Sequence, residues 1–220
     1  MPLLQPSSRD KILDVAEDLF ARRGFAGVGM REVADRVGLG KSSLFHHFRG
    51  KTQLYFEVLA RVLDRIRVRL EPALRPDVGP LERLDRGLGA LIDALAEHPA
   101  TARLLLRALF EDDEFPAEPG PEAERAERIL EDTLESIRRV LREGMEQGVL
   151  RRASVPHTLQ TLVGATVYHF ASGEFGDNLL GRPVLSAEAV AARKQELRNL
   201  LHHGLAANPA QPIGGPPWTS

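Results

Sequence analysis

The stretch that decides the fold runs from Gly24 to Leu54 and reads GFAGVGMREVADRVGLGKSSLFHHFRGKTQL. Apolar residues at helical spacing predict a short helix from Met30 to Val37, and Gly38-Leu39-Gly40 interrupts it. A second short helix is predicted from Lys41 to Phe48. Two short helices joined by a three-residue turn that contains glycine predict a helix-turn-helix, whose second helix can lie in the major groove of DNA.

The side chains of this segment suit contact with DNA. The small core is expected to contain the apolar residues Val33, Val37, Leu39, Leu44 and Phe48. The second helix would then present to base edges and phosphates the polar residues Lys41, Ser42, Ser43, His46 and His47. Arg31 and Lys51 each lie in the first turn of a flanking helix, where free backbone N–H groups and a cation together favour a phosphate.

Helical periodicity continues along the rest of the chain, with no strand-like alternation, so the predicted fold class is all-α. The further expected helices are Ile12–Phe20 with Gly24 at its end, Leu54–Leu70, Leu81–Leu95, Leu104–Phe110, Leu130–Met145, Val155–Phe170 and Glu188–Leu205. We expect Pro72, Pro76 and Pro80 to end the long helix that begins near Leu54. The acidic segment Asp112–Glu122 contains three prolines and is expected to form an exposed loop.

The predicted organisation is a DNA-binding domain at residues 1–52, a helical domain at 53–207 and a disordered tail at 208–220. The net charge of −2 conceals a segregation between these parts. Residues 1–52 contain nine Lys or Arg and six Asp or Glu, a net charge of +3, and the remaining residues carry −5. Such a charge asymmetry fits an interaction arm, and on charge alone it fits an ordinary solvated helical surface equally well.

Composition excludes several other classes. The chain of 220 residues has no cysteine, which removes disulfide scaffolds, thiolate metal sites and cysteine nucleophiles. No run of about 18 apolar residues is present and no apolar segment precedes the first charges, so we expect a soluble, cytoplasmic protein with no membrane contact. We expect no catalytic set and no cofactor, because the sequence contains no motif for either. We expect no metal site, because the histidines of the pairs His46-His47 and His202-His203 diverge on a helix.

Gly40-Lys41-Ser42 is similar to the end of a phosphate-binding P-loop, but Asp35 stands where that motif requires glycine. The 24–54 block as a whole resembles the DNA-binding domain of TetR-type transcriptional regulators. The matching positions are Gly24, Phe25, Val33, Ala34, Gly38, Leu39, Ser43, Leu44, Phe45, His47, Phe48, Lys51 and Leu54. The resemblance implies that the helix from Lys41 reads a pseudo-palindromic operator and that Lys51 holds a phosphate.

The block departs from the family pattern in one consistent way. Gly29, Gly40 and Gly50 stand where the family usually has Thr, Ser or Asn as helix N-caps, and Phe45 stands where a tyrosine is common. Glycine is tolerated at an N-cap but offers no hydroxyl. We therefore expect fewer neutral hydrogen bonds to phosphate and a greater dependence on Lys41, Lys51 and the histidines.

The resemblance also implies a second domain that holds a small-molecule effector, and a homodimer formed by the last two helices, here Val155–Phe170 and Glu188–Leu205. A mostly apolar effector is expected from the residue types of the candidate pocket. These candidates are Leu104, Leu105, Leu109, Phe110, Met145, Tyr168, His169 and Phe170. The resulting prediction is a repressor released by a small molecule. The alternatives are an activator, a regulator without ligand, and a helical binding protein or enzyme with an incidental helix-turn-helix.

Overall fold

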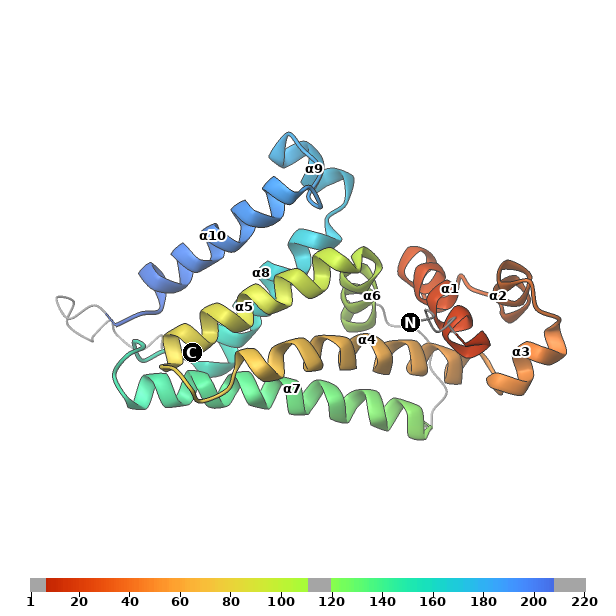
Figure 1. Cartoon of the computed structure of the whole chain (residues 1–220), viewed down its shortest axis with the longest axis horizontal. Helices are drawn as coiled ribbons and strands as arrows, with labels where there is room; N and C mark the ends of the chain where they lie inside the picture. Colours follow the sequence, from red (N-terminus) through yellow and green to blue (C-terminus); the bar gives the residue numbers. More distant parts are fainter. Residues whose placement is uncertain (1–6, 111–119, 208–220) are drawn as a thin grey trace, which may run out of the picture.

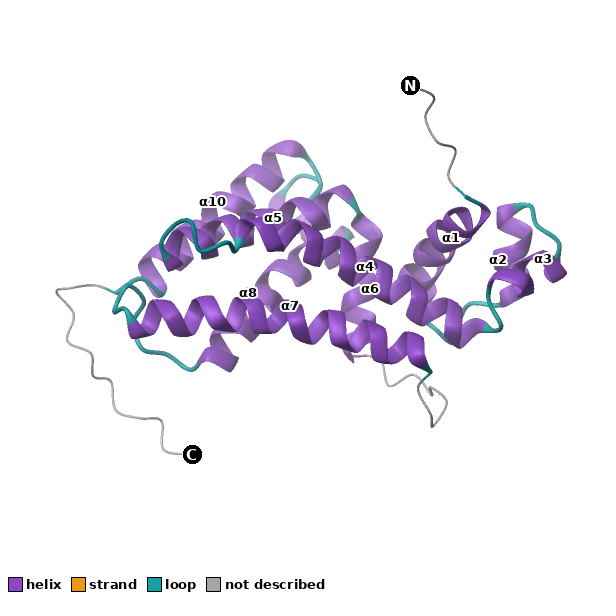
Figure 2. Cartoon of the chain, turned by 60° about the horizontal axis from the view of Figure 1, so that its bottom comes forward, coloured by secondary structure: helices purple, strands orange, loops and turns teal. Residues whose placement is uncertain are grey.

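The computed structural model describes residues 7–110 and 120–207, and these residues form helices joined by short loops, with one isolated β-bridge between Leu150 and Ala206. The predicted all-α fold class is confirmed (Figure 2). The helices are α1 (Ser8–Arg23), α2 (Met30–Val37), α3 (Lys41–His47), α4 (Lys51–Ala73), α5 (Pro80–Glu97), α6 (Pro99–Phe110), α7 (Pro121–Glu146), α8 (Val155–Ala171), α9 (Glu174–Leu180) and α10 (Ala187–Gly204).

The helices form two groups joined by α4. Figure 1 shows α1, α2 and α3 at one end of the molecule and the helical bundle at the other, with α4 extending from one to the other. Within the bundle α4 packs along α7 and α5, and α10 packs on the outer side of α5. The helix α6 contacts both α1 and α8, so it too lies between the groups.

The first helix has a clear start and a clear stop. The Ser7 side chain accepts a hydrogen bond from the Asp10 N–H, and the Asp10 carboxylate accepts one from the Ser7 N–H, which is a capping box. At the other end Gly24 has a φ of 69°, and its N–H bonds to the Phe20 carbonyl. This confirms Gly24 as the residue that ends α1. The Phe20 ring lies edge-on to Tyr55 of α4 at a centroid distance of 5.1 Å, which fixes α1 against α4.

Of two predicted boundaries at prolines, one is confirmed and one was wrong. The proline cluster ends α4 as predicted: Pro72 lies in the last turn, and the helix ends at Ala73, before Pro76. The missing proline N–H would have bonded to the carbonyl of Val68, and that residue is exposed, so water can take the free carbonyl. Pro121 and Glu122, expected in a loop, form the first turn of α7, where proline is favoured. The rest of that predicted loop lies in 111–119, outside the described residues, as does the predicted tail at 208–220.

One helix was missed. The seven-residue α9 lies between α8 and α10, so the two helices expected to form the dimer interface are not consecutive. Its apolar side chains Phe175 and Leu179 are 61% and 73% exposed. A helix of two turns that does not bury its apolar residues leaves no core-facing periodicity for a sequence pattern to reveal.

The glycine N-caps are confirmed, and their effect on stability is testable. Gly29, Gly40 and Gly50 precede α2, α3 and α4 in extended conformations, and no side chain caps any of these helices. A Cβ at any of the three would meet no atom within 4 Å. The triple variant Gly29→Ser/Gly40→Ser/Gly50→Ser should therefore raise the free energy of unfolding by about 1 kcal/mol, measured by urea denaturation.

Gly38 supplies the matched control. It also has open space around its Cβ position, but its φ is +73°, so any side chain there is strained. Gly38→Ser should lower the free energy of unfolding by about 1 kcal/mol. A triple variant that is less stable than the wild type would contradict the assignment of these three residues as N-caps.

Candidate functional site

The residues predicted to read DNA are gathered on α3. Leu44 is fully buried and Phe48, which follows the helix as its C-cap, is 1% exposed. The opposite side of α3 is exposed and carries Lys41, Ser42, Ser43, Phe45 and His46. His47 is half-buried, and its ring lies 5.7 Å from that of His46. The structure thus brings the predicted recognition residues onto one solvent-facing surface, with His47 at its edge.

The turn before α3 has the geometry that a helix-turn-helix requires. Gly38 ends α2 in the left-handed region, its N–H bonds to the Asp35 carbonyl, and the Leu39 N–H bonds to the Ala34 carbonyl at 2.9 Å. These bonds close the C-terminus of α2 and redirect the chain by way of Gly40 into α3. Val33 and Ala34 of α2 are buried, whereas Val37 and Leu39 are only partly buried. The predicted core therefore forms, with its two turn-side members at its margin.

The two predicted phosphate-binding cations next to α3, Arg31 and Lys51, differ in the contacts that they already make within the protein. The Arg31 side chain is 88% exposed, and its one ion pair among the described residues is with Asp35, at 4.0 Å. The Lys51 Nζ instead donates to the Phe25 carbonyl at 3.0 Å and lies 4.2 Å from the centre of the Phe25 ring. Lys51 thus binds the segment after α1 to the start of α4, a contact that the sequence analysis did not foresee. Two of its three ammonium protons remain for an anion.

Arg49 was missed as a candidate, although it lies between α3 and α4. Its backbone N–H donates to the Gln53 Oε1 at 2.7 Å, while its exposed guanidinium contacts no residue that the structure describes. Its position in a turn directly after the recognition helix was the available signal. Lys41, also exposed, has its Nζ 5.7 Å from the centre of the Phe45 ring, a cation–π distance that keeps the lysine along the outer side of α3.

Of the predicted effector residues whose side chains the structure describes, only Phe170 lines one of the cavities described. Leu104 and Leu105 pack in the core, Met145 is partly buried on α7, and Tyr168 is 55% exposed. The side chains of Leu109 and Phe110 lie outside the described set. Phe170 is buried and lines a cavity of about 220 Å³ between α1, α6 and the α8–α9 region.

His169 is half-buried, and its Nε2 has no hydrogen-bond partner among the described residues. Burial, and after it the Arg193 guanidinium, hold the pKa of His169 below its usual value. Burial therefore favours the neutral form of the ring. The ring packs edge-on against that of Phe170, with 4.8 Å between the ring centroids.

Two adjoining spaces lie elsewhere in the bundle. The first is a cleft of about 490 Å³ between α4, the α4–α5 loop and α7, which we call the arginine cleft because it is lined by Arg67, Arg75, Arg83 and Arg139. The second is a cavity of about 30 Å³, the leucine cavity, lined only by leucine, isoleucine, valine and glycine residues of α4, α5, α7 and α8. Leu70 and Leu74 line both spaces, so the two meet at these side chains.

A buried carboxylate joins the DNA-binding end to the bundle. Glu17 of α1 is 5% exposed, and its oxygens lie 2.9 Å from an Arg61 nitrogen and 2.5 Å from an Arg65 nitrogen, both of α4. The Thr101 hydroxyl of α6 donates to the same carboxylate at 3.2 Å and accepts from Arg65 at 3.0 Å. One charged group thus fixes α1, α4 and α6 relative to one another.

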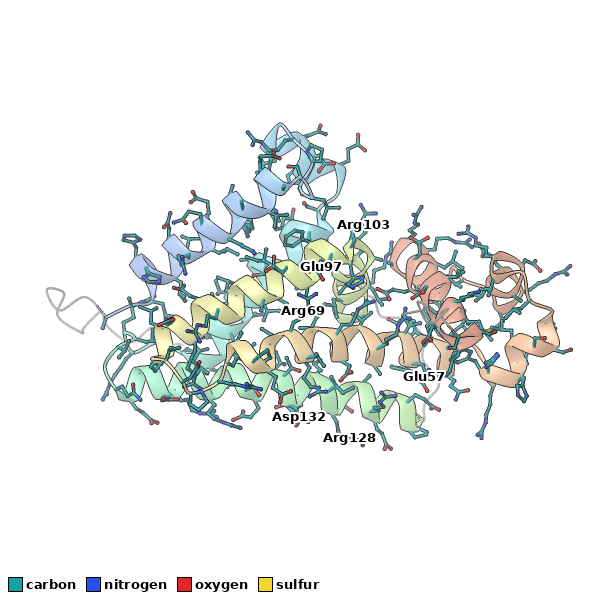
Figure 3. All side chains as sticks on the ribbon, viewed as in Figure 1. Glu57, Arg69, Glu97, Arg103, Arg128 and Asp132 are labelled. Carbon is teal, nitrogen blue, oxygen red and sulfur yellow. The ribbon has the colours of Figure 1, made fainter. Side chains whose placement is uncertain are left out.

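Further polar contacts reinforce this junction. Arg107 of α6 donates to the carbonyls of Ala21 and Arg22 in the last turn of α1. Glu57, labelled on α4 in Figure 3, pairs with Arg9 of α1 at 2.9 Å and with Arg125 of α7 at 3.5 Å. These contacts attach the last turn of α1 to α6 and connect α1 to α7 through Glu57 of α4.

No described helix is long and apolar enough to cross a membrane. No three His, Asp or Glu side chains of the described residues come together as metal ligands. A helix-turn-helix with an exposed recognition helix, carried on a long helix that continues into a bundle containing a cleft, defines a DNA-binding transcriptional regulator with a separate regulatory domain.

Comparison with known proteins identifies the family. The profile of bacterial regulatory proteins of the tetR family matches residues 12–58, and that of the tetracyclin repressor-like C-terminal domain matches residues 80–200. The chain therefore belongs to the TetR family of DNA-binding transcriptional regulators, as the resemblance predicted. The repressor KstR2 of Mycolicibacterium smegmatis is 30% identical over 148 residues, which cover 67% of this chain and 70% of that protein.

Two solved structures show the same fold. That of AibR in complex with isovaleryl coenzyme A and operator DNA has a TM-score of 0.71 at 16% identity, covering 88% of this chain and 97% of AibR. That of FadR from Bacillus subtilis in complex with stearoyl-CoA has a TM-score of 0.67 at 16% identity, covering 87% of this chain and 96% of FadR.

The Glu17 junction can be tested by comparing two carboxylates that bind the same arginine. Glu17→Gln leaves the guanidinium groups of Arg61 and Arg65 without their shared buried anion, so it should lower the free energy of unfolding by about 2 kcal/mol. Asp14 pairs with Arg61 at 2.8 Å but its side chain is 63% exposed. Asp14→Asn should therefore cost less than about 1 kcal/mol. Urea denaturation measures both, and equal losses would show that the burial of Glu17 is not what matters.

Proposed function

We propose that the protein binds a pseudo-palindromic operator as a homodimer and represses transcription until a small-molecule effector binds its helical domain. The observation that carries this proposal is the exposed side of α3, where Lys41, Ser42, Ser43, Phe45 and His46 face solvent at the end of the molecule farthest from the bundle (Figure 1). Such a surface fits the major groove, with Lys41 and Ser43 reaching base edges and Phe45 offering an apolar contact to a thymine methyl group. The protein would act in the cytoplasm, without catalysing a reaction.

Three helix N-termini can bind the DNA phosphates on either side of the groove. The first turns of α2, α3 and α4 have free N–H groups, because their glycine N-caps provide no side-chain acceptor. Arg31, Arg49 and Lys51 add positive charge at these ends. His47, at the margin of α3, can donate to a phosphate rather than to a base. In this arrangement backbone N–H groups donate the hydrogen bonds to phosphate, whereas Ser or Thr N-caps would contribute some of them from their hydroxyl groups.

The expected homodimer is supported by where the exposed apolar residues lie. Six of the nine large apolar side chains that are exposed in the described residues fall between residues 168 and 200. These six are Tyr168, Phe175, Leu179, Leu180, Leu185 and Leu200. Exposed large apolar side chains that are concentrated in one part of a chain indicate a surface that another protein covers. Two copies joined through α8 and α10, with α9 beside them, would hold their α3 helices about 34–36 Å apart for successive major grooves.

The effector class that we propose is an acyl thioester of coenzyme A. AibR and FadR, which share this fold, were determined with isovaleryl coenzyme A and stearoyl-CoA respectively. An effector that binds one arrangement of the bundle more tightly than another shifts the population toward that arrangement. The contacts of α1 with α4 and α6 would transmit the change, so that the two α3 helices no longer match the groove spacing.

Operator binding is tested by gel shift and footprinting with the DNA that adjoins the protein's own gene. A sequence-specific complex at moderate salt is expected, and isovaleryl-CoA or stearoyl-CoA should release it. A reporter gene under this DNA should be expressed more strongly when the regulator is deleted. Reduced expression on deletion would identify an activator, and the absence of any specific complex would refute the proposal.

The individual contacts are tested by variants of the exposed residues. Arg49→Ala should weaken binding to all DNA sequences by a similar factor, about three- to tenfold, because it removes a phosphate contact. Ser43→Ala and His46→Ala should instead change which bases are preferred, as measured by selection from a random DNA pool. Arg128→Ala, on α7 in the bundle, is the charge-matched control and should leave binding unchanged. If Arg49→Ala changes base preference and His46→Ala does not, the roles are assigned wrongly.

A further inference from the structure

We infer that the arginine cleft holds the phosphorylated part of an acyl-CoA effector and that the acyl group passes between Leu70 and Leu74 into the leucine cavity. This inference rests on the proposed function for the identity of the effector. The location rests on the structure, in which the arginine cleft, at about 490 Å³, is the largest of the cavities described. That volume lies within the range of about 300–1,000 Å³ that is usual for small-molecule sites.

Two guanidinium groups in the cleft have no partner. Arg75 enters from the α4–α5 loop and Arg139 from α7, so they stand on different walls, and neither forms an ion pair or hydrogen bond with any described residue. Both are exposed. An arginine presents a planar fork of donors that matches phosphate oxygens, and such charge-assisted bonds are among the stronger ones in proteins. Two unpaired forks facing one space fit a ligand with more than one phosphate.

The other two arginines are already engaged and shape the cleft. Arg83 is buried, its Nε donates to the Leu74 carbonyl at 3.0 Å and its guanidinium pairs with Glu143 at 2.6 Å. Arg67 pairs with Asp64 at 2.8 Å and with Glu71 at 3.3 Å. Arg83 thus fixes the backbone at Leu74, which is the residue that separates the cleft from the leucine cavity.

Asp132 is the acidic residue of the cleft that forms no ion pair with a described arginine, although the Arg67 guanidinium lies near enough to interact with its charge. Figure 3 shows Asp132 on α7, beside α4. A carboxylate repels phosphate but accepts hydrogen bonds from hydroxyl groups. Asp132 therefore fits a ribose hydroxyl, and the phosphates belong toward Arg75 and Arg139. A nucleotide carries both kinds of group, which free inorganic phosphate or a free fatty acid does not.

The apolar part of the ligand has an adjoining place. Leu74 and Gly87 both line the leucine cavity and lie against each other: a Cβ on Gly87 would come within 2.8 Å of the Leu74 Cδ2. Leu70 and Leu74 are single side chains between the cleft and the cavity. Rotation of Leu74 away from Gly87 joins the two spaces, and the acyl chain then replaces the leucine in contact with α5 and α8.

The phosphate half of the inference is tested by isothermal titration calorimetry without DNA, using isovaleryl-CoA, stearoyl-CoA and stearate. Arg75→Ala/Arg139→Ala should weaken binding of both thioesters by at least about tenfold, since two charge-assisted bonds are lost. Arg152→Ala removes an exposed arginine with no described partner outside the cleft and should leave the affinity unchanged. Both arginines of the cleft are exposed, so the double variant should keep the wild-type melting temperature.

The acyl half is tested with Gly87→Ala. Its methyl group occupies the space into which the leucine cavity must open, so binding of stearoyl-CoA should weaken by at least about fivefold. Binding of coenzyme A without an acyl group should not change. If Gly87→Ala lowers the melting temperature, Leu74→Ala provides a second measurement, because widening the passage should then strengthen the binding of stearoyl-CoA.

The possible outcomes separate this inference from the proposed function. Equal thioester affinities for the wild type and for Arg75→Ala/Arg139→Ala would overturn the cleft as the phosphate site, even if acyl-CoA still released the operator. Stearate binding as tightly as stearoyl-CoA, or no binding of either thioester, would overturn it as well. Failure of the wild type to bind its operator would refute the proposed function, whereas the calorimetry, which needs no DNA, would still decide the site.

Discussion

The structure depends on α4 being one uninterrupted helix that packs into both groups of helices. Near its start Leu54, Tyr55 and Val58 are buried against α1, and further along Ile66 and Leu70 are buried in the bundle. The buried residues of both ends form one continuous hydrophobic cluster. A hydrogen-bonded helix with a buried face at each end resists bending, so the two groups move as its ends move. The predicted boundary between residues 52 and 53 falls inside this helix.

Much of the fold could be predicted because most helices bury one apolar stripe. The limits of α2 were predicted correctly, and the start of α3 and the end of α1 follow from glycine positions. The periodicity of buried leucines could not reveal α9, which buries almost none of its side chains. It could not reveal the Glu17 junction either, because Thr101 lies 84 residues away in sequence and its role depends on how α6 packs. The recognition residues were predictable as a surface, whereas the engagement of Lys51 with Phe25 required coordinates.

The charge segregation seen in the sequence takes a narrower form in three dimensions. Of the nine basic residues in 1–52, five are engaged by acidic side chains: Arg9 by Glu57, Arg22 by Asp18, Arg31 by Asp35, and Arg23 and Arg36 by Glu32. The other four form no ion pair with a described residue, and two of these, Lys41 and Arg49, lie at the two ends of α3. The positive field is therefore concentrated around the recognition helix. The net charge of +3 for residues 1–52 does not show that this positive field points toward one side of the molecule.

The two helices proposed for the dimer interface differ in their main neighbours. The helix α8 packs mainly on α6 and α7, and also on α5, whereas α10 packs on α5, where Asp85 pairs with His202 and Arg198. A partner subunit that touched both α8 and α10 would sense any displacement between these two helices. By reciprocity, whatever one protomer binds would alter the surface offered to the other. In a dimer assembled in this way, the affinity of one protomer for the effector would depend on whether the other is occupied.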